Sequence, residues 1–474
     1  MSEREKIFKD SVHGYISVPN DWCSALIDTA IFQRLRCIEQ TSMRCLYPSA
    51  RHDRFIHSLG VYHLGRRLVD SLFANSHLCI SKHLSKTEAK TLRSTFLIAC
   101  LLHDCAHAPF SHTFEDYYNK ETDLVAVLER EMQSRGDQDF PNDSKHCSPA
   151  AHEVASAIIL LQVYEDSIRR LGADPCLAAR MIVGCSYYQN SGTPANQVRN
   201  AFISLLNGSI DVDKLDYIVR DTWASGVNNT SIDLDRLLSS VVIMSVDSQL
   251  AIAYKPTALS VIQSVVEARN YLYSWIYSHH KVAYNEYLLT TAVAKIGRLL
   301  TGTDDPAEGD GNLAKLFSLA TLTGYVTIGS FRFTLLSDGD IIHLLKHFQD
   351  QVEEAHEWLT RHHRKKPLWK SKAVFRDYFG ISDNAALNRM LAKARPALGA
   401  LGEECSFTVL NPQPKEVRIK ENEIQIQTSQ TRTIPFNVAV HVKPPAEERP
   451  LFYVYWKSPA PKIELVIEAL KRNR

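Results

Sequence analysis

Histidine residues gather in three short stretches of the sequence, each beside an apolar segment. The stretch LLHDCAHAPFSH (101–112) places His103 directly before Asp104 at the end of an apolar run. Adjacent side chains inside a helix point about 100° apart, so this pair converges on one ion only at a helix end. Imidazole nitrogen and carboxylate oxygen are ligands for Fe, Mn, Zn or Mg ions. The stretch therefore predicts part of a divalent-metal site.

Two other stretches add ligands to this pair. His57 lies in RFIHSLG, and Asp213 lies in the predicted helix of NGSIDVDKLDYIVRD. Tyr217, Arg220 and Asp221 follow Asp213 on one face of that helix. An isolated His-Asp pair is usually a buried hydrogen bond, but a helical face with a carboxylate, a phenol and a cation is costly to bury without a function. The expected metal ligands are His57, His103, Asp104 and Asp213.

Most of the first 300 residues are expected to be helical. Apolar residues recur there at three- and four-residue spacing in segments 22–40, 57–73, 88–103, 151–170, 195–222 and 258–300. A further helix is expected from Asp340 to about His362, with Ser337 or Asp338 as its start signal.

Beyond that helix the sequence has short runs typical of strands: CSFTVL, EVRIK, EIQIQTS, PFNVAVHV and LFYVYW. A closing helix is expected over about 460–472. The predicted fold is mainly α, an all-helical core with a smaller mixed α/β C-terminal lobe. The core should span 1–300, a linker or surface loop 301–312, and the lobe 313–474.

The composition is typical of a soluble globular protein, with 45% hydrophobic and 23% charged residues in 474. A formal net charge of +1 gives no overall basic field for nucleic acid. The ten cysteines form no C-x-x-C pair and are interpreted as reduced thiols. The amino terminus has no apolar signal segment, and the longest apolar run, Phe96 to Leu102, is too short for a bilayer. We therefore expect a cytoplasmic or nuclear protein without a membrane partner.

Seven blocks in order resemble the HD-domain deoxynucleoside triphosphate (dNTP) triphosphohydrolases, in the branch that includes the vertebrate SAM- and HD-domain enzyme. They are KIFKDSVHG, IDTAIFQRLRCIEQ, HDRFIHSLG, LLHDCAHAPFSH, HEVAS, IDVDKLDYIVRD and EARNYLYSWIYSHH. The resemblance covers about residues 5–300, and a SAM domain is not expected. It implies hydrolysis of dNTPs to deoxynucleoside and inorganic triphosphate with a divalent metal ion.

The resemblance also implies roles for individual residues. His107 and His152 would hold oxygens of the scissile α-phosphate, and His112 would be the general acid, oriented by Glu115. The triphosphate would be neutralised by Arg54, Lys214 and Arg269. The sugar would be held at its 3′-hydroxyl by Gln40 and Asp221 and walled by Tyr217 and Tyr277. Four positions depart from the vertebrate pattern: Glu115 stands for an Asp, Ser49 for a Gly, Thr41 for a Leu and Tyr273 for a His.

A second, regulatory site is also implied. Lys6, Asp28, Gln33 and Arg36 match residues that bind a guanine nucleotide activator in the family. The alternative is an ordinary helix surface with an internal ion pair. Because such sites lie between subunits, an operating site implies a homodimer or homotetramer, with the C-terminal lobe at the interface. Control of dNTP pools and antiviral defence are both compatible with this chemistry.

Two other functions remain open. The same metal site serves HD-type phosphodiesterases or nucleases that act on cyclic nucleotides or single-stranded nucleic acid. A nucleotide-gated sensor with weak catalysis is the third interpretation. The basic run RHHRKK (361–366) fits either a solvated helix end or a nucleic-acid contact, so nucleic acid as a partner stays undecided.

Overall fold

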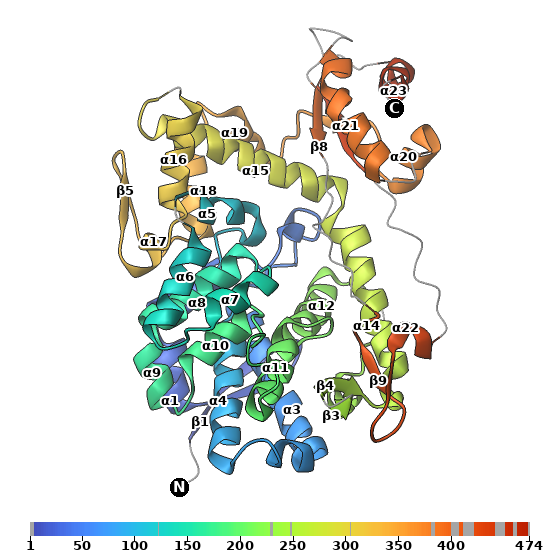
Figure 1. The fold of residues 1–474 in the computed structure, drawn as a ribbon. Coiled ribbons are helices and arrows are strands. Elements are labelled where there is room, and N and C mark those ends of the chain that lie inside the picture. Colours follow the sequence, from blue (N-terminus) through green and yellow to red (C-terminus); the bar gives the residue numbers. More distant parts are fainter. Residues whose placement is uncertain are drawn as a thin grey trace.

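The computed structural model describes residues 4–121, 123–227, 231–246, 249–303, 305–380, 384–399, 407–410, 421–440, 451–457 and 462–472. The mainly α fold predicted from the sequence is confirmed (Figure 1). Within these ranges, no helix is both long enough and apolar enough to cross a membrane. Nine of the ten cysteines lie in these ranges, and all nine are free.

The N-terminal half begins with a β-hairpin, which the sequence analysis did not predict. Its elements are β1 (Glu5–Asp10), β2 (Gly14–Pro19), α1 (Asn20–Trp22), a π-helix (Cys23–Ile27), α2 (Ala30–Arg34), α3 (Arg54–Ser81), α4 (Lys86–Leu102), a 3₁₀ helix (Ser111–Tyr117), α5 (Tyr118–Glu121), α6 (Leu124–Ser134), α7 (Phe140–Asp143), α8 (Ala151–Val163), α9 (Glu165–Arg170), α10 (Pro175–Ile182), α11 (Pro194–Asn207) and α12 (Val212–Ser225).

The following elements are mostly helices and add two further hairpins, β3–β4 and β5–β6. They are α13 (Leu234–Ser239), β3 (Val241–Val246), β4 (Gln249–Tyr254), α14 (Leu259–Tyr271), a π-helix (Leu272–Tyr277), α15 (His280–Leu299), α16 (Pro306–Leu316), α17 (Ala320–Thr323), β5 (Val326–Ile328), β6 (Phe331–Phe333), α18 (Asp338–Phe348) and α19 (Glu353–Thr360). The single helix expected over 340–362 is thus two helices, and Ser337 forms the predicted start as a capping box with Asp340.

The C-terminal elements are β7 (Lys366–Pro367), α20 (Lys372–Phe379), α21 (Asn384–Gly399), β8 (Phe407–Leu410), β9 (Gln425–Gln427), β10 (Thr433–Pro435), α22 (Phe436–Ala439), β11 (Tyr453–Trp456) and α23 (Ile463–Lys471). Strands are found within CSFTVL, EIQIQTS and LFYVYW as predicted. The strand predicted in PFNVAVHV is wrong for Phe436–Ala439, which form α22. The predicted strand EVRIK lies outside the described residues.

The described residues contain two large hydrophobic cores and one small cluster on β3 and β4. Residues of α16 and α18, such as Leu313 and Leu345, belong to the main core with α3 and α4. The second core joins Trp369, Phe452 and other residues of the C-terminal elements to one end of α15. From Pro306 onward the predicted linker 301–312 is helical, because α16 starts there.

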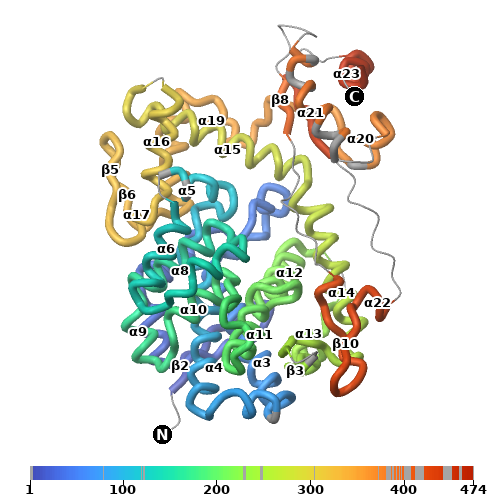
Figure 2. The backbone as a smooth tube through the Cα atoms, viewed as in Figure 1, coloured from blue at the N-terminus to red at the C-terminus, as the bar shows by residue number. Residues whose placement is uncertain are grey.

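The segment around β9 and β10 returns to the main core, although it lies between parts of the C-terminal lobe in sequence (Figure 2). β9 runs parallel to β4 and extends the β3–β4 hairpin into a sheet of order β10-β9-β4-β3. The lobe has its own sheet of order β7-β11-β8.

Three helix ends meet where the site residues lie. α3 begins after Asp53, whose side chain accepts a hydrogen bond from the Ile56 amide at 3.0 Å. α12 begins in the same way after Asp211, which accepts from the Lys214 amide at 2.7 Å. α4 ends at Leu102 and packs against α3. These boundaries put the expected metal ligands on the first turns of α3 and α12 and just beyond the end of α4.

Candidate active site

The four residues predicted as metal ligands lie together. The Nε2 atom of His57 is 3.0 Å from Oδ1 of Asp213 and 3.6 Å from Oδ2 of Asp104. The Nε2 atom of His103 is 3.5 Å from Oδ2 of Asp104 and 3.7 Å from Oδ1 of Asp213. Both Nε2 atoms are buried and make no hydrogen bond within the described residues. These two nitrogens and the Asp213 carboxylate are a donor set that could hold a divalent cation. The Asp104 carboxylate lies beside this set.

The Nδ1 atoms of His57 and His103, the ring nitrogens that are not the expected metal ligands, are held by hydrogen bonds. Nδ1 of His57 lies 2.8 Å from Oδ2 of Asp216, and Nδ1 of His103 lies 2.9 Å from the Cys100 carbonyl oxygen. Metal-binding histidines are usually held in this way, because the second nitrogen sets the ring orientation and tautomer. Each Nε2 atom is therefore free to serve as a ligand.

Asp216, which is fully buried, was not predicted from the sequence. Its carboxylate also lies 2.6 Å from Nε2 of His13 and accepts two hydrogen bonds from Arg220. Arg220 in turn donates to Asp10 at 2.8 Å. The spacing of Asp216 and Arg220 by four residues on α12 was the available signal. Arg220, predicted to share one helical face with Asp213 and Tyr217, has its guanidinium bound by Asp216 and Asp10.

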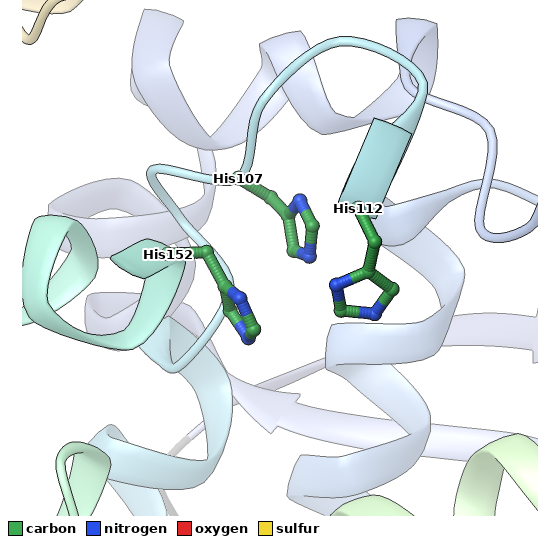
Figure 3. Close-up of side chains that lie close together, drawn as sticks. All are labelled: His107, His112 and His152. Carbon is green, nitrogen blue, oxygen red and sulfur yellow. The ribbon is translucent and has the colours of Figure 1, made fainter. Parts of the chain in front are cut away.

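Three more histidines form a second group (Figure 3). The rings of His107 and His152 are stacked at 4.3 Å, and the His112 ring lies 5.0 Å from that of His107. Glu115 holds two of them, because its carboxylate oxygens lie 3.0 Å from Nδ1 of His112 and 2.9 Å from Nδ1 of His152. His107 is fully buried, and its two ring nitrogens have no hydrogen-bond partner among the described residues.

The two groups differ in electrostatic character. Burial disfavours the charged form of His57, but Asp213 and Asp216 outweigh it and raise the pKa of the imidazole to about 9. At His107, burial and the positive charges of Arg54 and His152 lower the pKa well below its usual value. Burial also opposes the charged form of His152, but Glu115 raises its pKa. The site therefore offers a place for a cation next to a place for an anion.

Arg54 connects the two groups. It is buried, donates from Nη1 to Asp104 at 2.6 Å and donates from Nε to the Ser111 hydroxyl at 3.0 Å. Its Nη2 atom donates to the carbonyl oxygen of Gln40 at 3.2 Å. The Gln40 side-chain oxygen is buried without a hydrogen-bond partner in the described part of the chain. Arg54 thus holds the backbone of Gln40, which is predicted to bind the sugar.

The other predicted substrate residues form pairs. Arg269 donates to the Tyr217 hydroxyl at 3.1 Å, and Tyr277 donates to Asp221. The second Asp221 oxygen lies 2.6 Å from Nε2 of His52, which the sequence analysis left without a role. Lys214 is bound to Asp211 at 2.5 Å. Its ammonium group is therefore not directed at an open position.

The residues predicted for an activator make contacts among themselves. Lys6 pairs with Asp28 at 3.2 Å on the surface, and Arg36 donates to Gln33 at 2.8 Å while its guanidinium covers the Phe55 ring. These contacts match the alternative of an ordinary surface, so the activator site stays a prediction.

Comparison with known protein families identifies an HD domain over residues 54–170. The uncharacterized protein YwfO of Bacillus subtilis is similar at 29% identity, over 62% of this chain and 57% of that protein. The deoxynucleoside triphosphate triphosphohydrolase SAMHD1 of Homo sapiens is similar at 26% identity, over 75% of this chain and 53% of that enzyme. The matches thus span 53 to 57% of the length of these relatives.

Two crystal structures share the fold. A phosphohydrolase from Bacteroides thetaiotaomicron has a TM-score of 0.60 at 18% identity and covers 95% of this chain and 99% of its own. A hypothetical protein from Aquifex aeolicus has a TM-score of 0.56 at 21% identity and covers 99% of this chain and 100% of its own. At these identities the likeness is one of fold.

Proposed function

Because the chain carries an HD domain and resembles the HD-domain dNTP triphosphohydrolases, we propose that it is a metal-dependent hydrolase of deoxynucleoside triphosphates. The products would be a deoxynucleoside and inorganic triphosphate. The observation that carries the proposal is the adjacency of two groups. Two unpartnered histidine nitrogens and the Asp213 carboxylate, with the Asp104 carboxylate beside them, could hold a cation. Three histidines and an arginine suited to a phosphate lie next to this group.

The proposed metal ligands are His57, His103, Asp104 and Asp213. A divalent ion bound there would polarise an α-phosphate oxygen and promote deprotonation of the attacking water. The chain does not identify the ion, because Fe, Mn, Zn and Mg all accept this mixture of ligands. The orphaned Nε2 atoms of both histidines are the observation that fits such an ion.

The second histidine group would bind and protonate the phosphate ester. His107 and His152 would donate hydrogen bonds to α-phosphate oxygens, and the raised pKa of His152 favours its charged form. When water attacks the α-phosphorus, the bond to the 5′-oxygen breaks and that oxygen requires a proton. His112 would supply it from Nε2, since its Nδ1 is held by Glu115.

The remaining substrate roles follow the pairs in the structure. Gln40 and Asp221 would hold the sugar 3′-hydroxyl, and Tyr217 and Tyr277 would wall the sugar pocket. Tyr277 is paired with Asp221 and Tyr217 with Arg269. Arg269 and Lys214 would neutralise the triphosphate tail. Lys214 would have to exchange its contact with Asp211 for a phosphate oxygen when substrate binds.

A product assay tests the proposal. Purified protein is incubated with Mn²⁺ or Mg²⁺ and with single dNTPs, dNTP mixtures, cyclic nucleotides or single-stranded oligonucleotides. Deoxynucleoside plus inorganic triphosphate supports the proposal, whereas turnover of diesters without turnover of any dNTP overturns it in favour of a phosphodiesterase. Turnover of mixtures but not of single dNTPs would support an activator site at Lys6, Asp28, Gln33 and Arg36.

A pair of variants checks the metal assignment. His103→Ala and Asp104→Ala should each abolish Mn²⁺ binding and turnover while the circular dichroism spectrum stays that of the wild type. Val163→Ala is the control, because this exposed side chain on α8 is remote from the predicted ligands in sequence. Wild-type activity in either ligand variant would contradict the assignment.

A further inference from the structure

The loop that carries two of the site histidines is tied to a distant part of the chain. We call residues 105–112 the histidine loop; it follows the end of α4 and contains His107 and His112. Its Phe110 amide donates to Oδ1 of Asp338 at 2.6 Å, across 228 positions of sequence. Asp338 is the first residue of α18, and only 6% of its surface is exposed.

The same carboxylate also binds the segment next to Gln40. The Glu39 amide donates to Oδ2 of Asp338 at 2.8 Å, so each oxygen accepts from a different segment of the site. The Ser111 hydroxyl also donates to the Glu39 carbonyl, which joins the two segments directly. Asp338 therefore sets the spacing between the histidine loop and the segment predicted to hold the sugar.

Arg34 makes a second connection to the same region of the chain. Its buried guanidinium donates to the carbonyl oxygens of His107 at 2.8 Å and Cys105 at 3.2 Å. It also donates to the Leu336 carbonyl oxygen at 2.7 Å, two residues before Asp338. One arginine and one aspartate thus attach both ends of the histidine loop to residues 336–338.

The backbone of the loop needs such support. Phe110 and Ser111 have φ angles of 54° and 55°, in the left-handed region that side chains with a Cβ atom disfavour. Two consecutive residues stay in this region only where surrounding contacts hold them there. The Phe110 amide bond to Asp338 and the Ser111 hydroxyl bonds are contacts of this kind.

We propose that Asp338 and Arg34 are positioning residues for the histidine loop, which they hold at the distance from the Glu39–Gln40 segment that the reaction needs. This inference rests on the proposed function for its catalytic consequence. Among the described residues, neither side chain forms a hydrogen bond or ion pair with a predicted metal ligand, so both act through the backbone that carries His107 and His112. Displacement of a reacting group by about 1 Å can lower a rate about 100-fold.

The test compares Asp338→Asn with Asp143→Asn. The asparagine amide nitrogen cannot accept a hydrogen bond, so Asp338→Asn should leave one of the two backbone amides without an acceptor. Asp143 is a control for the loss of a buried carboxylate charge: it is buried beside Arg180, and its Oδ1 atom accepts the backbone amides of Tyr188 and Gln189 at 3.0 Å, so the asparagine oxygen can keep both bonds. It holds a segment that carries none of the proposed site residues.

Two readouts are measured for each variant. Hydrogen–deuterium exchange of peptides containing Glu39 and Phe110 should become about tenfold faster in Asp338→Asn and stay unchanged in Asp143→Asn. The kcat for dNTP hydrolysis should fall about 100-fold in Asp338→Asn and less than about threefold in the control. If Asp338→Asn does not fold, Arg34→Lys replaces it, since one ammonium group cannot reach three carbonyl oxygens, and the same loss of kcat is expected.

The outcomes separate the two proposals. A wild-type protein that hydrolyses no dNTP overturns the proposed function, and the exchange of the Glu39 and Phe110 amides then still decides the role of Asp338. If the Glu39 and Phe110 amides of Asp338→Asn exchange at the wild-type rate, the inference is overturned. An unchanged kcat in Asp338→Asn, or in Arg34→Lys where that variant is used, also overturns it when the wild-type enzyme is active.

Discussion

The Nδ1 atom of His57 lies 2.8 Å from a carboxylate oxygen of Asp216, and neither side chain has any exposed surface. Asp216 thereby fixes the ring of a proposed metal ligand while Arg220 and His13 hold the aspartate itself. Such outer contacts raise the basicity of the ligand and set its orientation.

Asp216→Asn should therefore lower the affinity for Mn²⁺ by about 10- to 100-fold. The measurement is a calorimetric titration of the purified protein with Mn²⁺. Asp70→Asn, on the exposed surface of α3 and paired with Arg93, should bind Mn²⁺ like the wild type. Equal affinities in the two variants would show that Asp216 does not support a metal ligand.

Metal binding should stabilise the fold. At a free Mn²⁺ concentration about 100 times the Kd, the free energy of unfolding should rise by about 2.7 kcal/mol, because the ion binds the folded chain alone. Urea unfolding with and without Mn²⁺ measures this rise, and excess chelator should remove it. In Asp213→Asn the rise should be lost; an equal rise in this variant would contradict the proposed ligand set.

Glu115→Gln should move the alkaline limb of the pH profile to lower pH. Burial opposes the charged form of His152, and Glu115 makes the largest contribution to raising its pKa, ahead of Glu153 and Asp104. Without that carboxylate the pKa falls, so His152 loses its proton, and its favourable charge toward phosphate, at a lower pH. The profile of kcat/KM against pH measures the shift. Glu115→Asp keeps the charge and should shift the limb less; an unshifted limb in Glu115→Gln would refute this role.

The stability of the protein should depend on pH through Asp338. Burial raises the pKa of this carboxyl from 3.8 to about 7, with Glu39 adding to the rise and Arg34 and two backbone amides opposing it. The unfolded chain releases this proton near pH 4 and the folded chain near pH 7. The contribution of Asp338 is thus complete below pH 4 and declines as pH rises to 7, by at most about 1.4 kcal/mol per pH unit.

Urea unfolding of the wild type and Asp338→Asn at several pH values tests this dependence. The asparagine does not titrate, so the stability of the wild type relative to the variant should fall between pH 4 and 7 and stay constant above. A difference that is independent of pH would contradict a raised pKa at Asp338.

Gly60→Ala should destabilise the fold. A Cβ atom at Gly60 in α3 would lie 1.9 Å from Oδ1 of Asp216, whose side chain is held by three partners. Overpacking of this kind costs about 1–3 kcal/mol. Gly311 is the matched helical control, since nothing lies within 4 Å of its Cβ position. The midpoint of urea unfolding should fall for Gly60→Ala and not for Gly311→Ala.

The sequence by itself determined the helical character and the residues of both histidine groups. The mainly α fold was predictable because amphipathic spacing is a local property of the chain. His103 and Asp104 could be placed at a helix end because the apolar run stops there, and α4 does end at Leu102. Glu115 lies where it was expected, although its contact with His152 in addition to His112 was not predicted.

Only the tertiary structure decided which charges are free and which are paired. Arg220 and Asp221 share α12, yet one is bound to Asp10 and Asp216 and the other to His52 and Tyr277. Asp338 accepts hydrogen bonds from the amides of Glu39 and Phe110, which lie 299 and 228 positions away from it in the sequence. No local pattern encodes such pairs, because they depend on how distant helices pack and on which buried donors need an acceptor.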